Sequence, residues 1–377
     1  MSRIKLVLLI SILCLSIIVV GQEPSNTSLT PFNYSASYTG DAVRNFHGGI
    51  SQNNGYLGLA NMMVNFSTDR ANWWGGGELM INGACTHGAT PSESFIGDFQ
   101  GAVNIEAGNL TYMHELWYKQ TFGKLTTVIG LQDVNAEFIT SDNSSLYINS
   151  SFGTPSTISE NIHAPIFPLT AFGLQLHYNF SERNALKIAV FDGFPDEADV
   201  NPYNLKWRLG NKDGYLTFTE FSTKLNLLKD KEGSFRFGAY THNHLTDTTK
   251  FIRKYGFYLV ADQYLYTSQS GQKYAMFIQA SYGPAKENLN NYYLGLGLNI
   301  SNIKIKNINS TLGIAMAHAG LKTPEYIHET SFELTYKMEL TENISIQPDV
   351  QYIINPMGTG VALNNATVGI LRFGLNF

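Results

Sequence analysis

The stretch FGLQLHYNF, residues 172–180, places two very different faces on one extended chain. Leu174, Leu176 and Tyr178 share one side and Gln175 and His177 the other, because the side chains of a strand alternate with a period of two. A soluble sandwich turns the apolar face inward, whereas a membrane barrel turns it outward toward lipid. The remainder of the chain decides between these two architectures.

The N-terminal residues have the pattern of a secretory signal peptide. Arg3 and Lys5 precede the uncharged run LVLLISILCLSIIVV, residues 6–20, which is shorter than the roughly 20 residues of a membrane-spanning helix. A small residue at position 21 predicts cleavage after Gly21, so residues 1–21 form the expected signal peptide. Only Cys85 then remains, so an intramolecular disulfide is impossible and a large core or a closed sheet must hold the chain together.

The composition favours a membrane barrel. Charged residues make up 15% of the chain, against roughly 25% in soluble domains, and aromatic residues make up 13%. The mean hydropathy is −0.11, and no stretch after residue 20 resembles a membrane-spanning helix. Without Arg3 and Lys5, 23 basic residues face 30 acidic ones, a net charge of −7. This charge argues against nucleic acid as a partner and against a pore that collects anions.

Alternating segments recur along the chain after residue 54. Each has about 9 to 12 residues, the length with which a tilted strand crosses a bilayer. We therefore predict an all-β, antiparallel transmembrane barrel of about 16 strands over residues 55–377. Residues 22–54 lack a sustained period and are interpreted as a flexible N-terminal lead. The expected strands are 55–66, 73–83, 110–122, 124–133, 172–180, 184–194, 214–225, 233–243, 255–266, 273–283, 292–300, 310–319, 330–340, 344–354 and 367–377.

One connection, residues 134–168, is much longer than the others. A loop of this length is uncommon in a compact domain unless it has a function. Two interpretations remain open at this point: the loop folds into the barrel and narrows the pore, or it lies exposed on the surface.

The chain ends with LRFGLNF, residues 371–377, in which Phe373, Leu375 and Phe377 alternate with polar or small residues. This ending resembles the C-terminal strand signal by which the assembly machinery recognises bacterial outer-membrane barrels. Together with the signal peptide, it predicts a protein of the bacterial outer membrane whose apolar face contacts lipid. The partners expected from this location are outer-membrane lipid, the barrel assembly machinery and, as an open alternative to a monomer, a homo-oligomer.

Several segments resemble the carbohydrate-selective porin family of the OprB type. They are LTYMHELWYKQTFGKLTTVIGLQDVNAEF (110–138), the following INSSFG, AFGLQLHYNF with KIAVFDGFP, ISIQPDVQYIINPMGTG and the final LRFGLNF. The resemblance extends from about residue 55 to residue 377. It implies a 16-stranded barrel through which small sugars diffuse passively into the periplasm.

A pore that favours sugars needs aromatic surfaces for the sugar ring and paired donors and acceptors for its hydroxyls. In LTYMHELWYKQ, strand parity places Glu115, Trp117 and Lys119 toward the lumen and Tyr112 and His114 toward lipid; a girdle at the membrane interface is the alternative location for Trp117. Asp133 lies where its strand passes into the long loop, which it could instead simply cap. The candidate sugar contacts are Glu115, Trp117, Lys119, Asp133, Gln175, His177, Arg236, Tyr240, Asp349, Gln351 and Arg372.

Catalytic and metal-binding patterns are weak in this sequence. It contains no HExxH, GxSxG or GxxxxGK[ST] motif, so we predict neither an enzyme nor a cofactor or metal site. The main alternative to a sugar-selective channel is a general diffusion porin. A barrel enzyme and a secreted soluble protein that binds glycans are the competing hypotheses from other classes.

Overall fold

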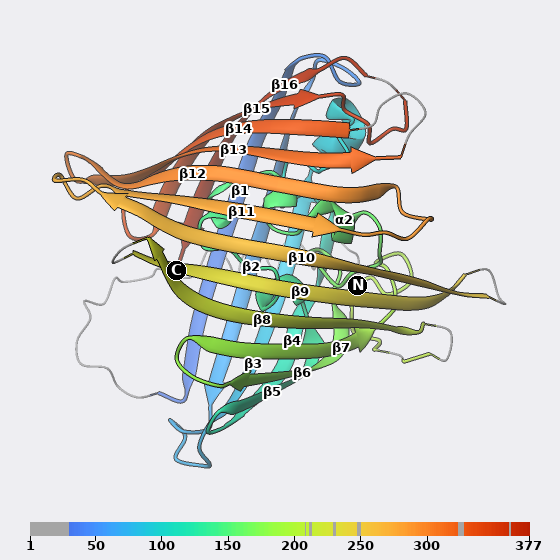
Figure 1. Ribbon diagram of the computed structural model, residues 1–377, viewed down its shortest axis with the longest axis vertical. Coiled ribbons are helices and arrows are strands. Elements are labelled where there is room, and N and C mark those ends of the chain that lie inside the picture. Colours follow the sequence, from blue (N-terminus) through green and yellow to red (C-terminus); the bar gives the residue numbers. More distant parts are fainter. Residues whose placement is uncertain are drawn as a thin grey trace, which may run out of the picture.

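The chain forms a closed antiparallel barrel of 16 strands in the computed structural model, which describes residues 30–377 except 208, 211–212, 229–230, 247–249, 323–327 and 362. Each strand pairs with its neighbours in sequence, and β1 pairs with β16 to close the ring (Figure 1). The expected signal peptide, residues 1–21, lies outside the described residues. The strands are β1 (Phe32–His47), β2 (Asn54–Ser67), β3 (Gly77–Gly88), β4 (Leu110–Phe122), β5 (Leu125–Gln132), β6 (Ala171–Asn179), β7 (Asn184–Asp192), β8 (Tyr215–Leu228), β9 (Lys231–Thr246), β10 (Lys250–Thr267), β11 (Lys273–Tyr282), β12 (Asn290–Ile305), β13 (Ile308–Leu321), β14 (His328–Glu339), β15 (Ile344–Ile354) and β16 (Ala366–Asn376).

All fifteen expected strands are present, and the sixteenth corrects the expected N-terminal boundary. Residues 32–47, which we assigned to a flexible lead, form β1, with alternating pairs to β2 and β16. Its inward side chains include Asp41 and Asn45, which are fully buried. Its outward face is interrupted by Gly40, over which the rings of Phe373 and Tyr56 pack too closely to admit a Cβ. Because of this gap in the apolar pattern, the alternation of the sequence does not reveal β1 as a strand.

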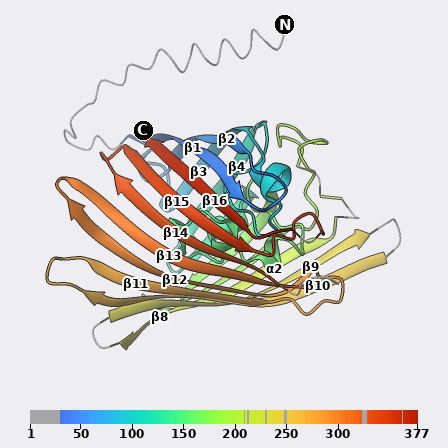
Figure 2. The ribbon, with the colours of Figure 1, turned by 90° about the horizontal axis from the view of Figure 1, so that it is seen from above.

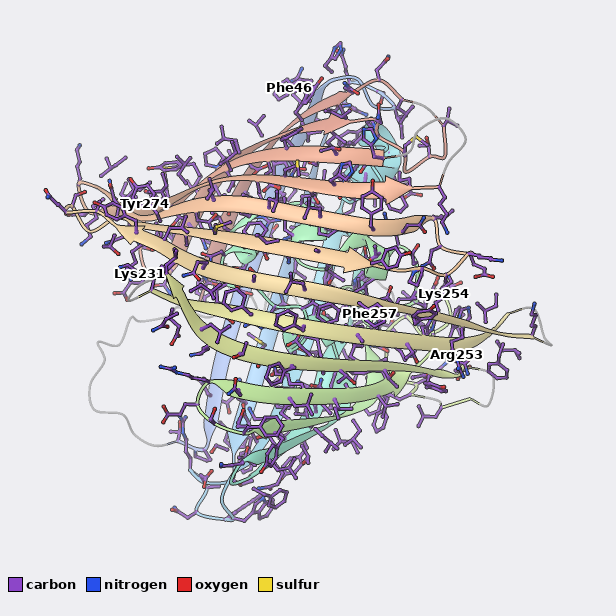
Figure 3. All side chains as sticks on the ribbon, viewed as in Figure 1. Phe46, Lys231, Arg253, Lys254, Phe257 and Tyr274 are labelled. Carbon is purple, nitrogen blue, oxygen red and sulfur yellow. The ribbon has the colours of Figure 1, made fainter. Side chains whose placement is uncertain are left out.

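The two faces of the barrel wall are reversed relative to a soluble protein. In β6, Leu174 and Leu176 are 40% and 41% exposed, whereas Gln175 between them is 1% exposed. Outward aromatic side chains such as Phe46 and Phe257 project from the surface (Figure 3). An apolar outer face around a polar interior is the arrangement of a barrel embedded in lipid. The apolar face of FGLQLHYNF therefore points outward, as predicted.

The two ends of the barrel differ. At one end, the turn end, neighbouring strands are joined by tight turns such as 123–124 and 306–307. At the other, the loop end, long connections join β3 to β4 and β5 to β6. Long loops are extracellular in outer-membrane barrels. Within the described part of the chain, no helix is long and apolar enough to cross a membrane.

The two longest loops near β4 and β5 fold into the barrel. We call residues 89–109 inner loop 1 and residues 133–170 inner loop 2. Seen from above, they and helix α2 lie within the ring of strands (Figure 2). Their short helical turns are η1 (Ser92–Ile96), η2 (Val134–Ala136), η3 (Ser144–Leu146), η4 (Ser150–Phe152) and α2 (Ser156–Ser159). The long loop therefore folds into the barrel, which was the first of its two interpretations, and does not lie exposed on the surface.

A β-bulge in β4 changes the face of several predicted side chains. The register with β3 shifts between Asn82 and Gly83, so that His114 has no partner residue opposite it. Beyond the bulge Glu115 points inward as expected, but before it Tyr112, 7% exposed, also points inward. The expected lipid-facing position of Tyr112 and His114 is therefore wrong, because a bulge adds a residue and reverses strand parity.

Candidate functional site

Inward carboxylates of the wall hold both inner loops by their backbone. The Glu329 carboxylate accepts hydrogen bonds from the backbone N–H of Phe99 (2.7 Å) and Gln100 (3.0 Å). Glu333 likewise accepts from the N–H of Ile148 (2.6 Å) and Asn149 (3.1 Å). Because a buried N–H is costly without an acceptor, these side chains specify where each loop lies.

The same arrangement continues around the wall. Asp262 accepts from the hydroxyl of Ser141 (2.7 Å) and the backbone N–H of Asn143 (3.2 Å), and Glu220 accepts from the N–H of Ile139 (2.9 Å). Apolar packing adds to these bonds. Inner loop 2 buries Val134, Phe138, Ile139 and Ile158 against the wall residues Ala189, Phe191, Leu216, Phe218, Tyr258 and Val260.

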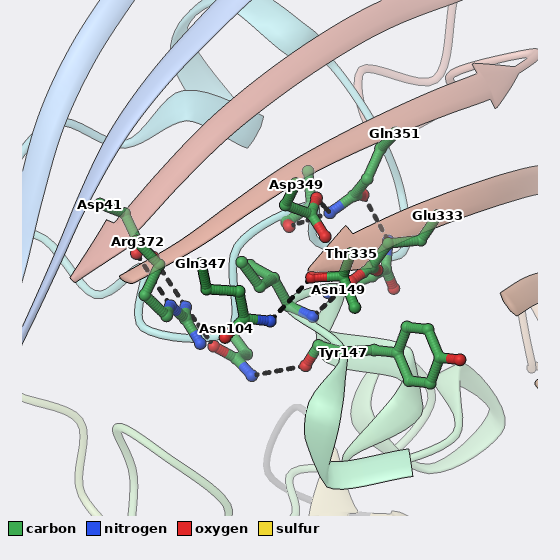
Figure 4. A network of polar contacts seen from close by, with 12 residues as sticks. Asp41, Asn104, Tyr147, Asn149, Glu333, Thr335, Gln347, Asp349, Gln351 and Arg372 are labelled. Atoms are coloured by element: carbon green, nitrogen blue, oxygen red, sulfur yellow. Dashed lines mark hydrogen bonds and ion pairs between the residues drawn. The ribbon is translucent and has the colours of Figure 1, made fainter. Parts of the chain in front are cut away.

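The inner loops also contact each other beside the seam of the barrel. The backbone N–H of Asn104 donates to the carbonyl of Ile148 (2.9 Å). The side-chain oxygen of Asn104 accepts from the guanidinium of Arg372 (2.7 Å), which also forms a two-point ion pair with Asp41 (2.8 and 2.7 Å). Figure 4 shows this network, which joins β1, β16 and inner loop 1.

Between the inner loops lies a cavity of about 800 Å³, which we call the constriction chamber. Its volume falls in the range of roughly 300–1,000 Å³ that small-molecule sites occupy. The rings of Phe99 and Phe167 and the amides of Asn104 and Asn135 line it. Its charged and titratable lining side chains are Asp98, Glu106, Asp133, Glu160, His163 and Arg372.

Acidic groups dominate the chamber electrostatically. Burial raises the pKa of Glu106 to about 7 and the pKa of Asp133 to about 7, the latter with a contribution from the neighbouring Glu115. The pKa of Glu160 is also raised to about 7, because this side chain lies deep in the barrel although it faces the chamber. Desolvation raises the pKa of Asp98, which is 6% exposed.

A second cavity of about 330 Å³ adjoins the chamber toward the loop end, and we call it the outer cavity. It shares His163, Pro168 and Leu169 with the chamber. Its other walls come from inner loop 1, the start of β4 and described residues 196–204 of the β7–β8 connection. The two cavities therefore adjoin along these shared residues.

Only two of the predicted sugar contacts, Asp133 and Arg372, line the chamber. Asp133 also caps the first turn of inner loop 2, since its carboxylate accepts from the N–H of Asn135 (2.7 Å). The same carboxylate lies 3.7 Å from the imidazole of His114, the residue at the bulge. Both proposed roles of Asp133, at the constriction and as a cap, are compatible with this geometry.

The other predicted contacts lie inward, but most hold the wall or a loop. Tyr240 donates its hydroxyl to the carbonyl of Thr157 (3.0 Å), and Gln351 donates to the carbonyl of Ala102 (2.9 Å). Asp349, 2% exposed, accepts a 3.4 Å hydrogen bond from Gln351.

The Gln175 amide donates to Gln132 (2.5 Å) and contacts His177 (2.8 Å). The imidazole of His177 in turn lies 4.0 Å from the Glu137 carboxylate of inner loop 2.

Three predicted contacts lie toward the turn end. Lys119 forms an ion pair with Glu78 (2.5 Å), and its ammonium lies 5.4 Å from the ring of Trp117. Trp117 pairs with the inward Met80, so it belongs to the lumen wall and not to an outer girdle. Arg236 lies 3.6 Å from Asp262 and lines a separate cavity of about 270 Å³.

Sequence reasoning missed the residues that shape the chamber. Glu333 lies on the polar face of its strand, a signal that was visible as lumen-facing parity. Glu220 and Asp262 share their inner faces with apolar residues, and Glu329 lies one residue before its expected strand. Asp98 and Glu160 lie in loops without period, so no local pattern indicates them. Within the described residues, no group of three or more His, Cys, Asp or Glu side chains could hold a metal ion.

The proposed assembly residues lie at the seam. Phe373 stacks on Tyr56, with ring centroids 6.1 Å apart, and Leu375 is opposite Tyr38. Phe377 is 64% exposed, and its backbone N–H donates to the carbonyl of Ala36 (2.8 Å).

Comparisons with known proteins identify relatives of this barrel. The family model described as carbohydrate-selective porin, OprB family, matches residues 52–377. The high-pH structure of Pseudomonas putida OprB is similar with a TM-score of 0.80 and 17% identity, covering 92% of this chain and 94% of that one.

The low-pH structure of the same porin has a TM-score of 0.60 and 14% identity, covering 92% and 93%. Salmonella typhi OmpF has a TM-score of 0.58 and 7% identity, covering 92% and 97%. At these identities the structural matches show the fold alone. No curated protein has a matching sequence.

Proposed function

This chain belongs to the carbohydrate-selective porin family, OprB, and on that premise we propose that small sugars cross its barrel through the outer cavity and the constriction chamber. Family and fold make it a bacterial outer-membrane channel for sugars and do not favour a general diffusion porin. A channel requires no catalytic constellation, and the porin fold suggests a channel and not an enzyme.

The observation that carries the proposal is the lining of the chamber. Phe99 and Phe167 offer apolar surface to a sugar ring, while Asn135, Glu160 and Arg372 place polar groups beside its hydroxyls. A lining of single, separated polar groups binds weakly, as conduction requires, because a solute that binds tightly does not leave. Asp133 and Arg372 remain the predicted residues proposed to contact sugar. The remaining candidates are proposed to position the wall and loops.

The proposal extends to export and assembly. Residues 1–21 act as a signal peptide that is removed after Gly21, and the barrel assembly machinery reads Phe373, Leu375 and Phe377. The exposed ring of Phe377 and the position of β16 at the seam with β1 support this role. Association of barrels into a homo-oligomer is compatible with the proposal, and cross-linking of the purified protein measures it.

Liposome swelling tests the proposed function. Purified, detergent-refolded protein is reconstituted and exposed to glucose, to a disaccharide and to uncharged amino acids of similar size. We expect glucose to enter faster than size-matched amino acids. Rates that follow size alone would favour a general diffusion porin, and the absence of swelling by a folded barrel would contradict a channel altogether.

A further inference from the structure

The constriction chamber holds an excess of carboxylates over cations. Asp98, Glu106, Asp133 and Glu160 all line it, from both inner loops. The lining cation Arg372 is already neutralised by its two-point pair with Asp41. Two buried wall carboxylates lie near these acids: Glu329 of β14 acts electrostatically on Asp98, and Glu115 of β4 acts on Asp133.

Asp98 distinguishes this arrangement from an ordinary group of surface acids. It is 94% buried, and the hydroxyl of Ser92 and the backbone N–H groups of Gly101 and Ala102 stabilise its charged form, although none of them makes a hydrogen bond of good geometry. Buried carboxylates are normally paired or hydrogen-bonded, because an unpaired one loses its hydration without compensation. The charge of Asp98 is therefore incompletely compensated, and it acts on the chamber through space.

The remaining titratable groups near the chamber do not offset these acids. The imidazole of His163 lies 4.0 Å from Glu197 and stacks on Phe194, with ring centroids 4.3 Å apart. His114 faces the capping carboxylate of Asp133 at 3.7 Å. Lys254 of β10 donates to the carbonyl of Asn161 (2.5 Å), in the wall behind inner loop 2, and does not line the chamber.

We propose that the constriction chamber selects for positive charge, so that protonated amino sugars pass more readily than anionic sugar derivatives such as sugar acids and sugar phosphates. This inference rests on the proposed function, since it assigns a charge preference to the same sugar path. The physical basis is Coulombic: carboxylates whose charge no cation neutralises lower the energy of a cation in a narrow passage and raise that of an anion. Neutral sugars, which carry no net charge, cross without this contribution.

Zero-current potentials across planar bilayers measure the preference. The full-length mature protein is inserted at pH 8 under a KCl gradient, and then under gradients of glucosamine hydrochloride or potassium gluconate. We expect potassium to be more permeant than chloride, glucosamine more permeant than chloride, and gluconate less permeant than potassium. A preference for chloride or gluconate would overturn the inference.

Variants locate the preference in the chamber. Asp98→Asn keeps the shape of a buried side chain that lines the chamber, and Glu160→Gln alters one that faces the chamber water. Each should lower the potassium-to-chloride permeability ratio by about fivefold, the effect of one unit charge about 4 Å from a permeating ion in water. Glu342→Gln, in the exposed turn between β14 and β15, is the matched control and should leave the ratio unchanged.

The outcomes separate this inference from the proposed function. If Asp98→Asn and Glu160→Gln both leave the potassium-to-chloride ratio unchanged, the assignment of the selectivity to these carboxylates is overturned. Glu160→Gln keeps the test valid if Asp98→Asn fails to fold. Glucose-driven swelling is measured with the same preparations. Glucose uptake without cation preference overturns the inference alone, whereas absent glucose uptake overturns the proposed function.

Discussion

Replacing Glu329 by alanine should widen the pore without unfolding the barrel. This side chain is fully buried on the inner face of β14. Its carboxylate accepts hydrogen bonds from the backbone N–H of Phe99 (2.7 Å), Gln100 (3.0 Å) and Met357 (2.9 Å). It therefore holds inner loop 1 and the β15–β16 connection to one strand of the wall.

The substitution should destabilise the docked position of inner loop 1 strongly and the folded barrel only slightly. A buried N–H that loses its acceptor costs roughly 1–3 kcal/mol, so three of them cost roughly 3–9 kcal/mol. Inner loop 1 escapes this penalty by moving into the water of the lumen. The main-chain ladders of β14 with β13 and β15 do not involve the side chain and remain intact. The chamber should therefore open while the strands stay paired.

Single-channel conductance and the heat-dependent mobility shift of folded barrels in gels measure the two effects separately. Glu329→Ala should raise conductance and weaken the discrimination between glucose and size-matched solutes, and Glu329→Gln, which retains one oxygen, should fall between it and the wild type. Glu78→Ala serves as the control, since Glu78 pairs with Lys119 and not with a loop. A folded Glu329→Ala barrel with unchanged conductance and discrimination would refute the assignment of this carboxylate as a loop anchor.

Three further predictions concern the chamber, the seam and inner loop 2. Because burial raises the pKa of Glu160 to about 7, this acid carries its charge only above that pH, so the potassium-to-chloride permeability ratio should rise between pH 5 and pH 8; a flat profile would contradict this. Arg372→Met leaves the buried Asp41 unpaired at a cost of about 3–5 kcal/mol and should lower the unfolding temperature in detergent, and the double variant Asp41→Asn/Arg372→Met should recover most of the loss. Phe138→Ala removes a fully buried ring at a cost of about 3–5 kcal/mol and should raise conductance with the barrel still folded, as gel mobility shows; a destabilised wall would argue instead that this ring supports the strands.

The barrel wall was predictable because its physics is local. Lipid on one side and water on the other impose a period of two on every strand, and fifteen of the sixteen strands show it. The periodicity did not reveal β1, because Gly40 and Arg44 interrupt its apolar outward face. At Gly40 the close packing of Phe373 leaves no room for a side chain. The bulge at His114 was not predicted either. Assigning faces by alternation assumes one residue per step, so one extra residue in the strand goes undetected.

The interior of the pore was less predictable because its contacts are long-range. The alternation within each strand predicted which side chains point inward, and Gln175 and Tyr240 do point inward. Parity does not indicate whether an inward side chain meets water or a folded loop, and both of these meet protein. The chamber itself is formed by loop segments distant in sequence, so only Asp133 and Arg372 of the predicted contacts line it.

The central claim is that sugars cross through the constriction chamber, and blocking that chamber tests it most directly. A Ser159→Cys variant, made in a Cys85→Ser background, places a single thiol on the chamber wall, and a bulky methanethiosulfonate reagent then modifies it. Ser181→Cys, in the β6–β7 turn, is the control outside the chamber. The account predicts that labelling at 159 strongly slows glucose-driven liposome swelling, while labelling at 181 does not. Unchanged glucose uptake by a fully labelled Ser159→Cys barrel would contradict it.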